Sequence, residues 1–340
     1  MIVTGVMAGD RPPADDGRGP GGPGPVSAPV SRRAAAGLLA TAWMTLGGYA
    51  VRAAGPDEPA RLAGAVSFDL GGDADRAPWR ITLYIPPGAA PVDGWPVLYL
   101  LDGNAVTGTA IDIERVQAPY PDATGIASRF AVVGIGYPGD EAHDAARRSW
   151  DYTPPPGRSY PGHRPGGPTM RTGGADAFLH FVTTTLRSAV AQRCRVDPAR
   201  QALFGHSFGG LFVLYALAHR PDAFSHWIAA SPSIHWEDRV VLKSLARLEQ
   251  GPPVRARVHL SAGVYEEALA PFQDRAPDRA ARLERLTSAQ MIALARAMAE
   301  RLGRIPGVTS EFRLIPRRTH MTVLPDAVND AVAFFLQRGT

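Results

Sequence analysis

One short segment, residues 201–217, restricts the possible folds of this chain more than any other. It contains the pattern Gly-x-Ser-x-Gly at Gly205–Gly209, with Ser207 at its centre. An apolar run suited to a buried strand comes just before the pattern. Apolar residues at helical spacing follow it, namely Leu211, Leu214, Tyr215 and Leu217. Strand, sharp turn and helix in this order are typical of a nucleophile elbow, which exposes a serine hydroxyl at the tip of a sheet.

The predicted elbow also indicates chemistry. A turn this sharp forces Ser207 into strained backbone angles, and a glycine two residues away on either side lets the chain pass close by. The N-terminus of the next helix directs amide N–H groups toward any negative charge that develops beside the serine. Because the pattern also arises by chance in a chain with 36 glycines, the prediction that Ser207 is a nucleophile depends on the flanking strand and helix.

The rest of the chain predicts a sheet of mainly parallel strands with helices on both faces. Further strands are expected at 79–85, 95–101, 130–136, 226–230, 258–261 and 310–315, and helices at 175–193, 239–249, 286–302 and 325–337. Alternation of this kind indicates an α/β protein, and together with the elbow it predicts the α/β-hydrolase fold. With 45% hydrophobic residues, a single catalytic domain over 56–340 is the simplest organisation.

The segment 1–55 differs in composition from the rest. Its first thirty residues are rich in Gly, Pro and Asp, which predicts disorder. Arg32 and Arg33 then precede an uncharged, alanine-rich stretch, and small residues follow at 53–55. This order indicates a twin-arginine-like or general export signal, and hence a periplasmic or secreted product. A membrane anchor is the alternative, but the stretch is short for a stable span, so none is expected in the mature protein.

Charge and motif patterns exclude two classes of partner. The net charge is +4, but Lys243 is the only lysine and the arginines are dispersed, so nucleic-acid binding is not expected. The pattern Gly-x-Gly-x-x-Gly at Gly134–Gly139 follows a strand, yet Pro138 and an acidic stretch prevent a helix from starting there, which argues against dinucleotide binding. No metal or organic cofactor is expected. The partner is a small-molecule ester, and the single Cys194 excludes an internal disulfide.

A serine nucleophile needs a base, and His320 is the candidate. In this fold the histidine comes last, between the final strand and the terminal helix, and among nine histidines His320 occupies that place. His206 lies inside the elbow and is expected to shape the substrate pocket. Four others fall within predicted helices or strands and are expected to be structural: His180, His219, His226 and His259.

Two further parts of the machinery are expected near strand ends. The acid that orients the histidine should follow the strand ending at Ser261, where Glu266 is the first choice, Glu267 the second, and absence of an acid a third possibility. One oxyanion donor should be the N–H of Phe208, directly after the nucleophile. The second should come from the loop after residue 101, where Gly103 allows close approach of the backbone.

Several short motifs occur together in one order: Leu100–Asn104, Trp150–Pro154, Gly173–Ala175, Gly205–Gly210 and Ser231–Trp236. As a set they resemble the Putative esterase family of α/β-hydrolases, and within it the periplasmic trilactone siderophore esterases, over residues 65–338. The resemblance implies hydrolysis of enterobactin-like catecholate macrolactones by Ser207 and His320, as a dyad or as part of a triad. His235 and Met321 depart from the family pattern and leave the substrate less defined than the chemistry.

The resemblance also implies substrate-binding residues. Arg148, with Arg147 beside it, matches a family arginine that can meet an anionic catecholate. Asn104, His206 and Trp236 are further candidates, and Tyr160 and Arg164 on the Pro/Gly-rich loop 153–168 are expected to face a bulky aromatic group. The alternatives are a feruloyl or acetyl carbohydrate esterase, an acyltransferase of the same fold, and a binding protein without catalysis.

Overall fold

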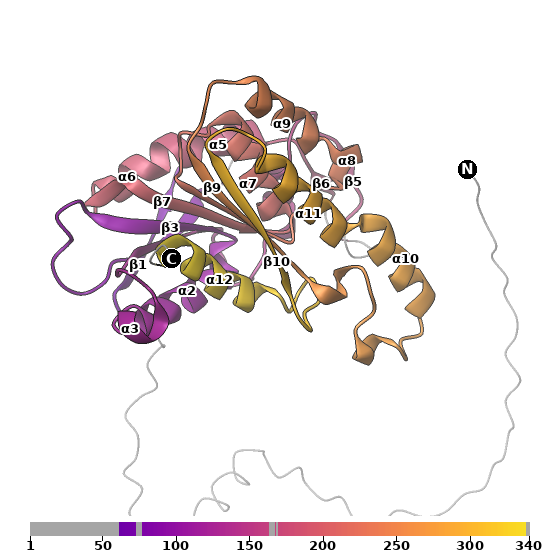
Figure 1. Ribbon diagram of the computed structural model, residues 1–340, viewed down its shortest axis with the longest axis horizontal. Coiled ribbons are helices and arrows are strands. Elements are labelled where there is room, and N and C mark those ends of the chain that lie inside the picture. The colour runs from indigo at the N-terminus through magenta and orange to yellow at the C-terminus, as the bar shows by residue number, and fades with distance from the viewer. Residues whose placement is uncertain (1–60, 73–76, 163–166, 168, 338–340) are drawn as a thin grey trace, which may run out of the picture. The chain divides into compact units, whose positions relative to one another are not determined.

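The computed structural model describes residues 61–72, 77–162, 167 and 169–337 (Figure 1). One eight-stranded sheet runs through these residues in the order β1-β2-β4-β3-β7-β8-β9-β10. Only the β1/β2 and β2/β4 pairs are antiparallel, and every other pair is parallel. The strands are β1 (Ala65–Leu70), β2 (Trp79–Tyr84), β3 (Trp95–Leu101), β4 (Ala131–Gly136), β7 (Val196–His206), β8 (His226–Ala230), β9 (Ala256–Gly263) and β10 (Val308–Ile315). The mainly parallel sheet of the predicted α/β-hydrolase fold is confirmed.

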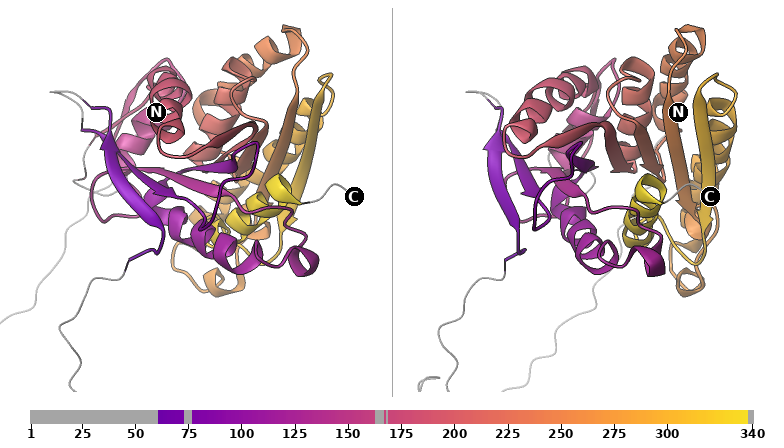
Figure 2. Two further views of the ribbon diagram at one scale, coloured as in Figure 1. Left: turned by 90° about the vertical axis from the view of Figure 1, so that its left-hand side faces the viewer. Right: turned by 60° about the vertical axis from the view of Figure 1, so that its left-hand side comes forward.

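Helices cover both faces of the sheet (Figure 2). One face packs against α7 (Phe208–His219), α9 (Val241–Gln250), α11 (Met291–Leu302) and a helix built from α5 (Ala175–Phe181), a π-helical turn (Val182–Leu186) and α6 (Arg187–Ala191). The other face packs against α2 (Gly103–Gln117) and α12 (Leu324–Leu336). Shorter elements are α3 (Pro121–Thr124), α4 (Ala145–Tyr152), α8 (Trp236–Arg239), α10 (Arg279–Ala289), the hairpin β5 (Ser159–Tyr160) and β6 (Met170–Arg171), and the 3₁₀ turns η2 (Val264–Glu266) and η3 (Pro271–Gln273).

The two faces form separate hydrophobic cores because side chains alternate along each strand. In β3, Tyr99 and Leu101 enter the first core, whereas Leu98 and Leu100 enter the second. All seven residues of β3 are buried. A strand covered on both sides reads as a continuous apolar run, which is why its position is evident from the sequence.

The glycines of β4 have a packing function. A Cβ on Gly134 would lie 1.9 Å from Thr107 Oγ1, and a Cβ on Gly136 would lie 1.9 Å from Asn104 Oδ1. Both partners belong to α2, which begins directly after β3 where the sequence predicted only a turn. These glycines therefore let α2 pack closely on β4.

One predicted helix is divided in the structure. The sequence predicted a helix over 286–302, but Gln290 has a left-handed φ of 49° and separates α10 from α11. Residues of α11 such as Ala295 and Leu302 are buried against the sheet. In α10 no residue is buried. Without a buried face to hold it on the axis of α11, α10 takes a different direction.

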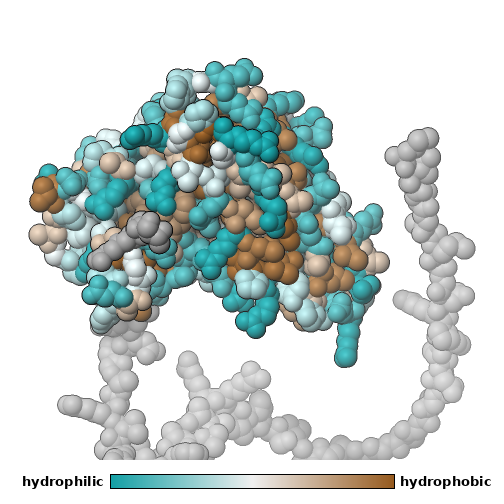
Figure 3. Space-filling view, in the orientation of Figure 1, coloured by the Kyte–Doolittle hydropathy of each residue, from teal (hydrophilic) through white to brown (hydrophobic). Residues whose placement is uncertain are grey.

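Hydrophilic side chains cover most of the face shown in Figure 3, with apolar groups in separate patches. Three of the exposed apolar side chains follow β9 or lie near the end of β10: Phe272, Leu314 and Met321. No helix in the described part of the chain is long and apolar enough to cross a membrane. The segment 1–55, with its predicted disorder and export signal, lies outside the described residues.

Candidate active site

The predicted elbow joins β7 to α7. Ser207 has φ 60° and ψ −117°, an unfavourable conformation for a residue with a side chain, and α7 begins at Phe208. A Cβ on Gly205 would lie 2.3 Å from the carbonyl oxygen of Gly209. The bend therefore requires glycine at position 205, and it presents the Ser207 hydroxyl at the carboxyl edge of the sheet.

A chain of hydrogen bonds links three distant segments. The Ser207 Oγ lies 3.0 Å from His320 Nε2, and His320 Nδ1 lies 2.9 Å from Glu266 Oε2. The serine follows β7, the glutamate follows β9 and the histidine follows β10. These strands are parallel, so their carboxyl ends meet at one edge and bring together side chains that are 54 and 113 residues from His320.

The structure places Glu266, and not Glu267, against His320. The Glu266 side chain is buried, with 1% of its surface exposed. Glu267 turns the other way, where its Oε1 accepts a hydrogen bond from the Ala293 N–H at 2.8 Å. Of the two glutamates that the sequence left open for the acid, Glu266 is the one within hydrogen-bond distance of His320.

This arrangement fixes the direction of proton transfer. A carboxylate can only accept, so His320 donates from Nδ1 to Glu266, and its Nε2 then accepts from the Ser207 hydroxyl. That tautomer has a general base facing the hydroxyl. A carboxylate behind the imidazole stabilises the positive charge that forms when the base takes a proton.

Two helix N-termini meet beside Ser207. Phe208 is the first residue of α7 and Gly103 is the first residue of α2, positions at which backbone N–H groups lack partners within their helix. A Cβ on Gly209 would lie 3.5 Å from Leu101 Cβ and 3.6 Å from Asp102 Oδ2, so the β3–α2 turn contacts the elbow. The predicted donors Phe208 and Gly103 thus belong to adjacent helix ends.

A cavity of about 600 Å³ opens at this position. One part of its wall is polar, with Glu141, His143 and Arg148 beside the serine and histidine. The other part is apolar, with Ala145, Ala146, Met170 and Met321. A cavity of this size with polar groups on one side suits a small organic molecule.

Arg148 lines this cavity, but its charge is already paired. Its Nε and Nη2 donate to the two carboxylate oxygens of Asp102, each at 2.9 Å, and Nη2 also lies 3.4 Å from the carbonyl oxygen of His206. Burial acts to raise the pKa of Asp102, but the Arg148 charge, the nearby His143 ring and the hydrogen bonds from Arg148 hold that pKa well below its usual range. Arg148 therefore lines the cavity as one half of an ion pair with Asp102, and its contact with an anionic substrate stays a prediction.

His206 forms part of the cavity wall, as expected. Its ring lies 4.6 Å from the ring of His320, centroid to centroid, and only 5% of its surface is exposed. Burial, followed by the proximity of His320 and Arg148, lowers the pKa of His206 well below its usual value. The ring is therefore neutral at ordinary pH and does not add a cation beside the base.

Asn104, Trp236 and Tyr160 were also predicted to bind substrate, but they are not among the described residues that line the cavity. Asn104 accepts from the Tyr137 N–H and donates to the Tyr137 carbonyl, each at 3.0 Å, so its amide fixes the loop after β4. Trp236 packs between Phe208 and Tyr160, with ring centroids 4.7 Å and 5.1 Å away. These three rings form an aromatic cluster next to the elbow. Arg164 lies outside the described residues.

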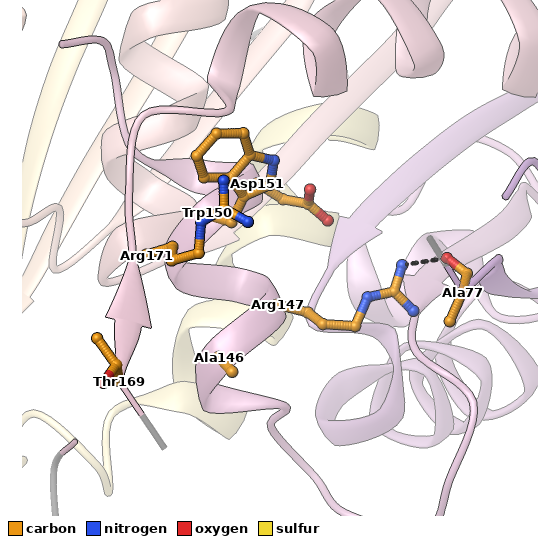
Figure 4. A pocket seen from close by; sticks show the side chains of 7 residues that line it. All are labelled: Ala77, Ala146, Arg147, Trp150, Asp151, Thr169 and Arg171. Atoms are coloured by element: carbon orange, nitrogen blue, oxygen red, sulfur yellow. Dashed lines mark hydrogen bonds between the residues drawn. The ribbon is translucent and has the colours of Figure 1, made fainter. Parts of the chain in front are cut away.

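A second cavity, of about 470 Å³, is lined in part by residues of α4, among them Arg147 and Trp150 (Figure 4). The close-up shows Arg147 extended toward Ala77 and Arg171 beside the ring of Trp150. Arg147 donates to the carbonyl oxygens of Ala77 and Pro78 at 2.8 Å and 2.7 Å. Arg147 therefore holds the segment before β2, and it is not among the described residues that line the cavity beside Ser207.

Sequence reasoning missed Ser233 and Met170 as neighbours of the site. The Ser233 Oγ lies 3.4 Å from the Ser207 Oγ, and Met170 lines the cavity from β6. The motif at Ser231–Trp236 could have indicated Ser233. The position of Met170 depends on how the β5–β6 hairpin packs against the site, which the sequence does not indicate. Among the described residues, no cluster of three or more His, Cys, Asp or Glu side chains is arranged to hold a metal ion.

Comparison with known proteins places these features in context. A family model described as "Putative esterase" matches residues 76–309. The ferri-bacillibactin esterase BesA of Bacillus subtilis is 35% identical over 267 residues, covering 76% of this chain and 84% of that protein. The siderophore enterobactin esterase of Emericella nidulans is 36% identical over 226 residues, covering 62% and 73%.

Solved structures give a consistent result. The siderophore hydrolase EstA from Aspergillus nidulans has a TM-score of 0.71 at 28% identity, covering 83% of this chain and 97% of that one. The BES protein from Bacillus cereus has a TM-score of 0.69 at 26% identity, covering 82% and 98%. The likeness covers 97–98% of the two solved structures and 82–83% of this chain.

Proposed function

This chain belongs to the Putative esterase family, and from that premise we propose that it cleaves the ester bonds of a macrocyclic siderophore by serine catalysis. The observation that carries the proposal is the hydrogen-bonded series Ser207–His320–Glu266 at the mouth of a cavity of about 600 Å³. Ser207 is the nucleophile, His320 the general base and Glu266 the group that orients the base. The reaction class is carboxylic ester hydrolysis.

In acylation, Ser207 Oγ attacks the ester carbonyl while its proton passes to His320 Nε2, which lies 3.0 Å away. The negative charge on the carbonyl oxygen is stabilised by the N–H of Phe208, with the N–H of Gly103 as the second donor. When the tetrahedral intermediate collapses, His320 returns the proton to the leaving alkoxide, and an alcohol and an acyl-enzyme result. In a macrolactone both products of this step are one molecule, because the alcohol is part of the same ring.

Deacylation repeats these steps with water. His320 takes a proton from water, the hydroxide oxygen attacks the acyl carbonyl, and the Ser207 oxygen leaves with the proton that His320 returns. The product is a linear carboxylic acid. Neutral His206 beside His320 is compatible with this cycle, since a second cation there would oppose the protonated base.

The siderophore substrate is supported by two relatives that match over 84% and 73% of their own length. Their names specify ferri-bacillibactin and enterobactin as what those proteins act on. Within this chain, the rings of Phe208, Trp236 and Tyr160 supply an aromatic surface next to the elbow. The aromatic rings that a catecholate trilactone carries beside its ester bonds suit such a surface. Arg148, which lines the cavity, presents to the substrate an ion pair with Asp102 and not an isolated cation.

We propose further that residues 56–340 form one catalytic domain and that the preceding segment directs export to the periplasm or beyond. Support for export is the sequence pattern of Arg32, Arg33 and the alanine-rich stretch after them. Fractionation of cells that express the full chain tests it. Recovery of an uncleaved chain from the cytoplasm alone would contradict it.

Purified protein should be assayed with a catecholate trilactone in iron-free and ferric form, a triacetylated hydroxamate macrolactone, simple aryl esters and feruloyl sugars. We expect the trilactone to give the highest kcat/KM and a linear acid as product, with Ser207→Ala as the inactive control. A preference for feruloyl sugars would contradict the siderophore substrate but leave the proposal of serine esterase catalysis intact. Failure of a fluorophosphonate to label Ser207 would contradict the proposed serine catalysis as well.

A further inference from the structure

Ser231 is a buried residue held at a fixed place between two strands. It directly follows β8, its surface is 0% exposed, and its φ of 45° is left-handed. Its N–H donates to the carbonyl oxygen of Ser261 on β9 at 2.7 Å. Left-handed backbone is unfavourable for serine, so the surrounding contacts impose this conformation.

The hydroxyl of Ser231 lies 2.6 Å from Glu266 Oε1. Because the ionised carboxylate can only accept, the hydroxyl is the donor. The N–H of Gly263 donates to the same oxygen at 2.7 Å, whereas Oε2 accepts from His320. The two oxygens of this carboxylate are thus divided, one held by Ser231 and Gly263 and the other facing His320.

We propose that Ser231 is a positioning residue, whose hydroxyl fixes the orientation of the Glu266 carboxylate so that Oε2 stays aligned with His320 Nδ1. It rests on the proposed function of Ser207, His320 and Glu266. Ser231 is fully buried and makes no contact with the cavity, so its effect passes through Glu266. Without the Ser231 hydroxyl, Oε1 would keep one donor, the Gly263 N–H, and would be held less firmly, and the loss of a bond to a buried ionised group is costly.

Ser261 offers a matched control for this hydroxyl. It lies in the adjacent strand with 1% of its surface exposed, and its hydroxyl has no hydrogen-bond partner among the described residues. Ser261→Ala and Ser231→Ala therefore remove the same atom from neighbouring buried positions. Only the second removes a bond to the carboxylate.

The experiment is a double-mutant cycle on the full chain. We expect Ser231→Ala to lower kcat by roughly ten- to a hundredfold with KM changed by less than about twofold, the range for one hydrogen bond to a charged group. In a Glu266→Gln background the same substitution should lower kcat by less than about twofold, because the group through which it acts is already altered. Ser261→Ala should leave kcat unchanged. Full kcat in Ser231→Ala, or an equal loss in both backgrounds, would overturn the proposal.

A second measurement does not depend on a substrate. The proton on His320 Nδ1 should give a downfield NMR resonance in the wild type that moves or broadens in Ser231→Ala but not in Ser261→Ala. If the wild type hydrolyses no ester, the proposed function fails, and this resonance still decides the role of Ser231: no change in either variant refutes it. Should Ser231→Ala fail to fold, Ser231→Cys keeps the shape with a weaker donor, and the same readouts apply.

Discussion

Two regions of this molecule bring serine, histidine and glutamate side chains within hydrogen-bond distance, yet only one has the surroundings of an active site. In the first, Ser207, His320 and Glu266 are joined at 3.0 Å and 2.9 Å beside a cavity. In the second, Ser225 Oγ lies 2.9 Å from His226 Nδ1, and nearby His259 Nδ1 lies 2.7 Å from a glutamate, Glu311.

The second region is a structural cluster beneath α12. The ring of His226 packs against Phe334 and Phe335, with centroids 5.6 Å and 5.1 Å away. The Ser225 hydroxyl donates to the carbonyl oxygen of Gln201 at 2.9 Å, so its proton does not point toward His226. No strained turn or helix N-terminus accompanies this serine. Short distances are therefore insufficient for catalysis, which also needs the elbow, the oxyanion donors and space for substrate.

The largest expected effect comes from removing the nucleophile. Ser207→Ala should lower kcat by about three to six orders of magnitude, because no group is left to form the acyl-enzyme. Steady-state hydrolysis of the preferred ester measures it, with Ser225→Ala as the comparison. Activity near the wild-type level would show that the elbow serine is not the nucleophile.

The next effect tests the acid. Glu266→Gln keeps the shape of the side chain but removes the charge that stabilises protonated His320, so kcat should fall by about two to four orders of magnitude. Glu267→Gln, in which the altered group faces Ala293 instead, is the control and should change kcat by less than about threefold. Equal losses in the two variants would contradict the assignment of Glu266.

The structural cluster should respond to pH instead. Burial, with the Arg257 charge as the second cause, lowers the pKa of His226 from its usual 6.5 to about 4. Between these values the unfolded chain binds a proton that the folded chain does not, so the free energy of unfolding should fall as pH drops from about 6.5 to about 4. The contribution is at most about 3 kcal/mol.

Urea unfolding of the wild type and of His226→Gln over this pH range measures the contribution. The variant cannot take the proton, so the difference between the two curves isolates the histidine from other titrating groups. Parallel curves for the two proteins would mean that His226 does not titrate differently on folding.

The smallest effect is expected for Ser225→Ala. It removes the hydroxyl of a half-buried serine and its three hydrogen bonds, to the N–H and carbonyl groups of Gln201 and to His226 Nδ1, which should cost about 1–2 kcal/mol of stability. We expect kcat to stay within about twofold of the wild type. Thermal unfolding and the standard ester assay measure the two quantities. A hundredfold loss of kcat without unfolding would remove the distinction between the two regions.

The sequence was sufficient for features that have a local signal. The elbow is evident at Ser207 because glycine spacing, an apolar strand and helical periodicity all fall within one segment. His320 could be assigned because the fold offers one slot between the last strand and the last helix. The buried strand β3 was evident from its continuous apolar run.

Pairings across the fold had no such signal. Asp102 neutralises Arg148 across 46 residues, and Ser231 bonds Glu266 across 35. Neither pair has a spacing that a helix or strand would bring together, so both depend on which strands are neighbours in the sheet. The sequence predicted a loop around Gly103, but α2 begins at this residue. Gly103 packs closely on Gly134, a contact between strand and helix that the sequence does not indicate.

The location of His320 has a consequence for biosynthesis. The proposed base follows β10, which comes last in the chain among the described strands of the sheet and lies at its edge beside β9. A ribosome that has just added Ser207 has 113 further residues to add before the proposed proton acceptor is in place. We therefore expect a nascent polypeptide that ends before residue 320 to carry an unactivated Ser207 hydroxyl.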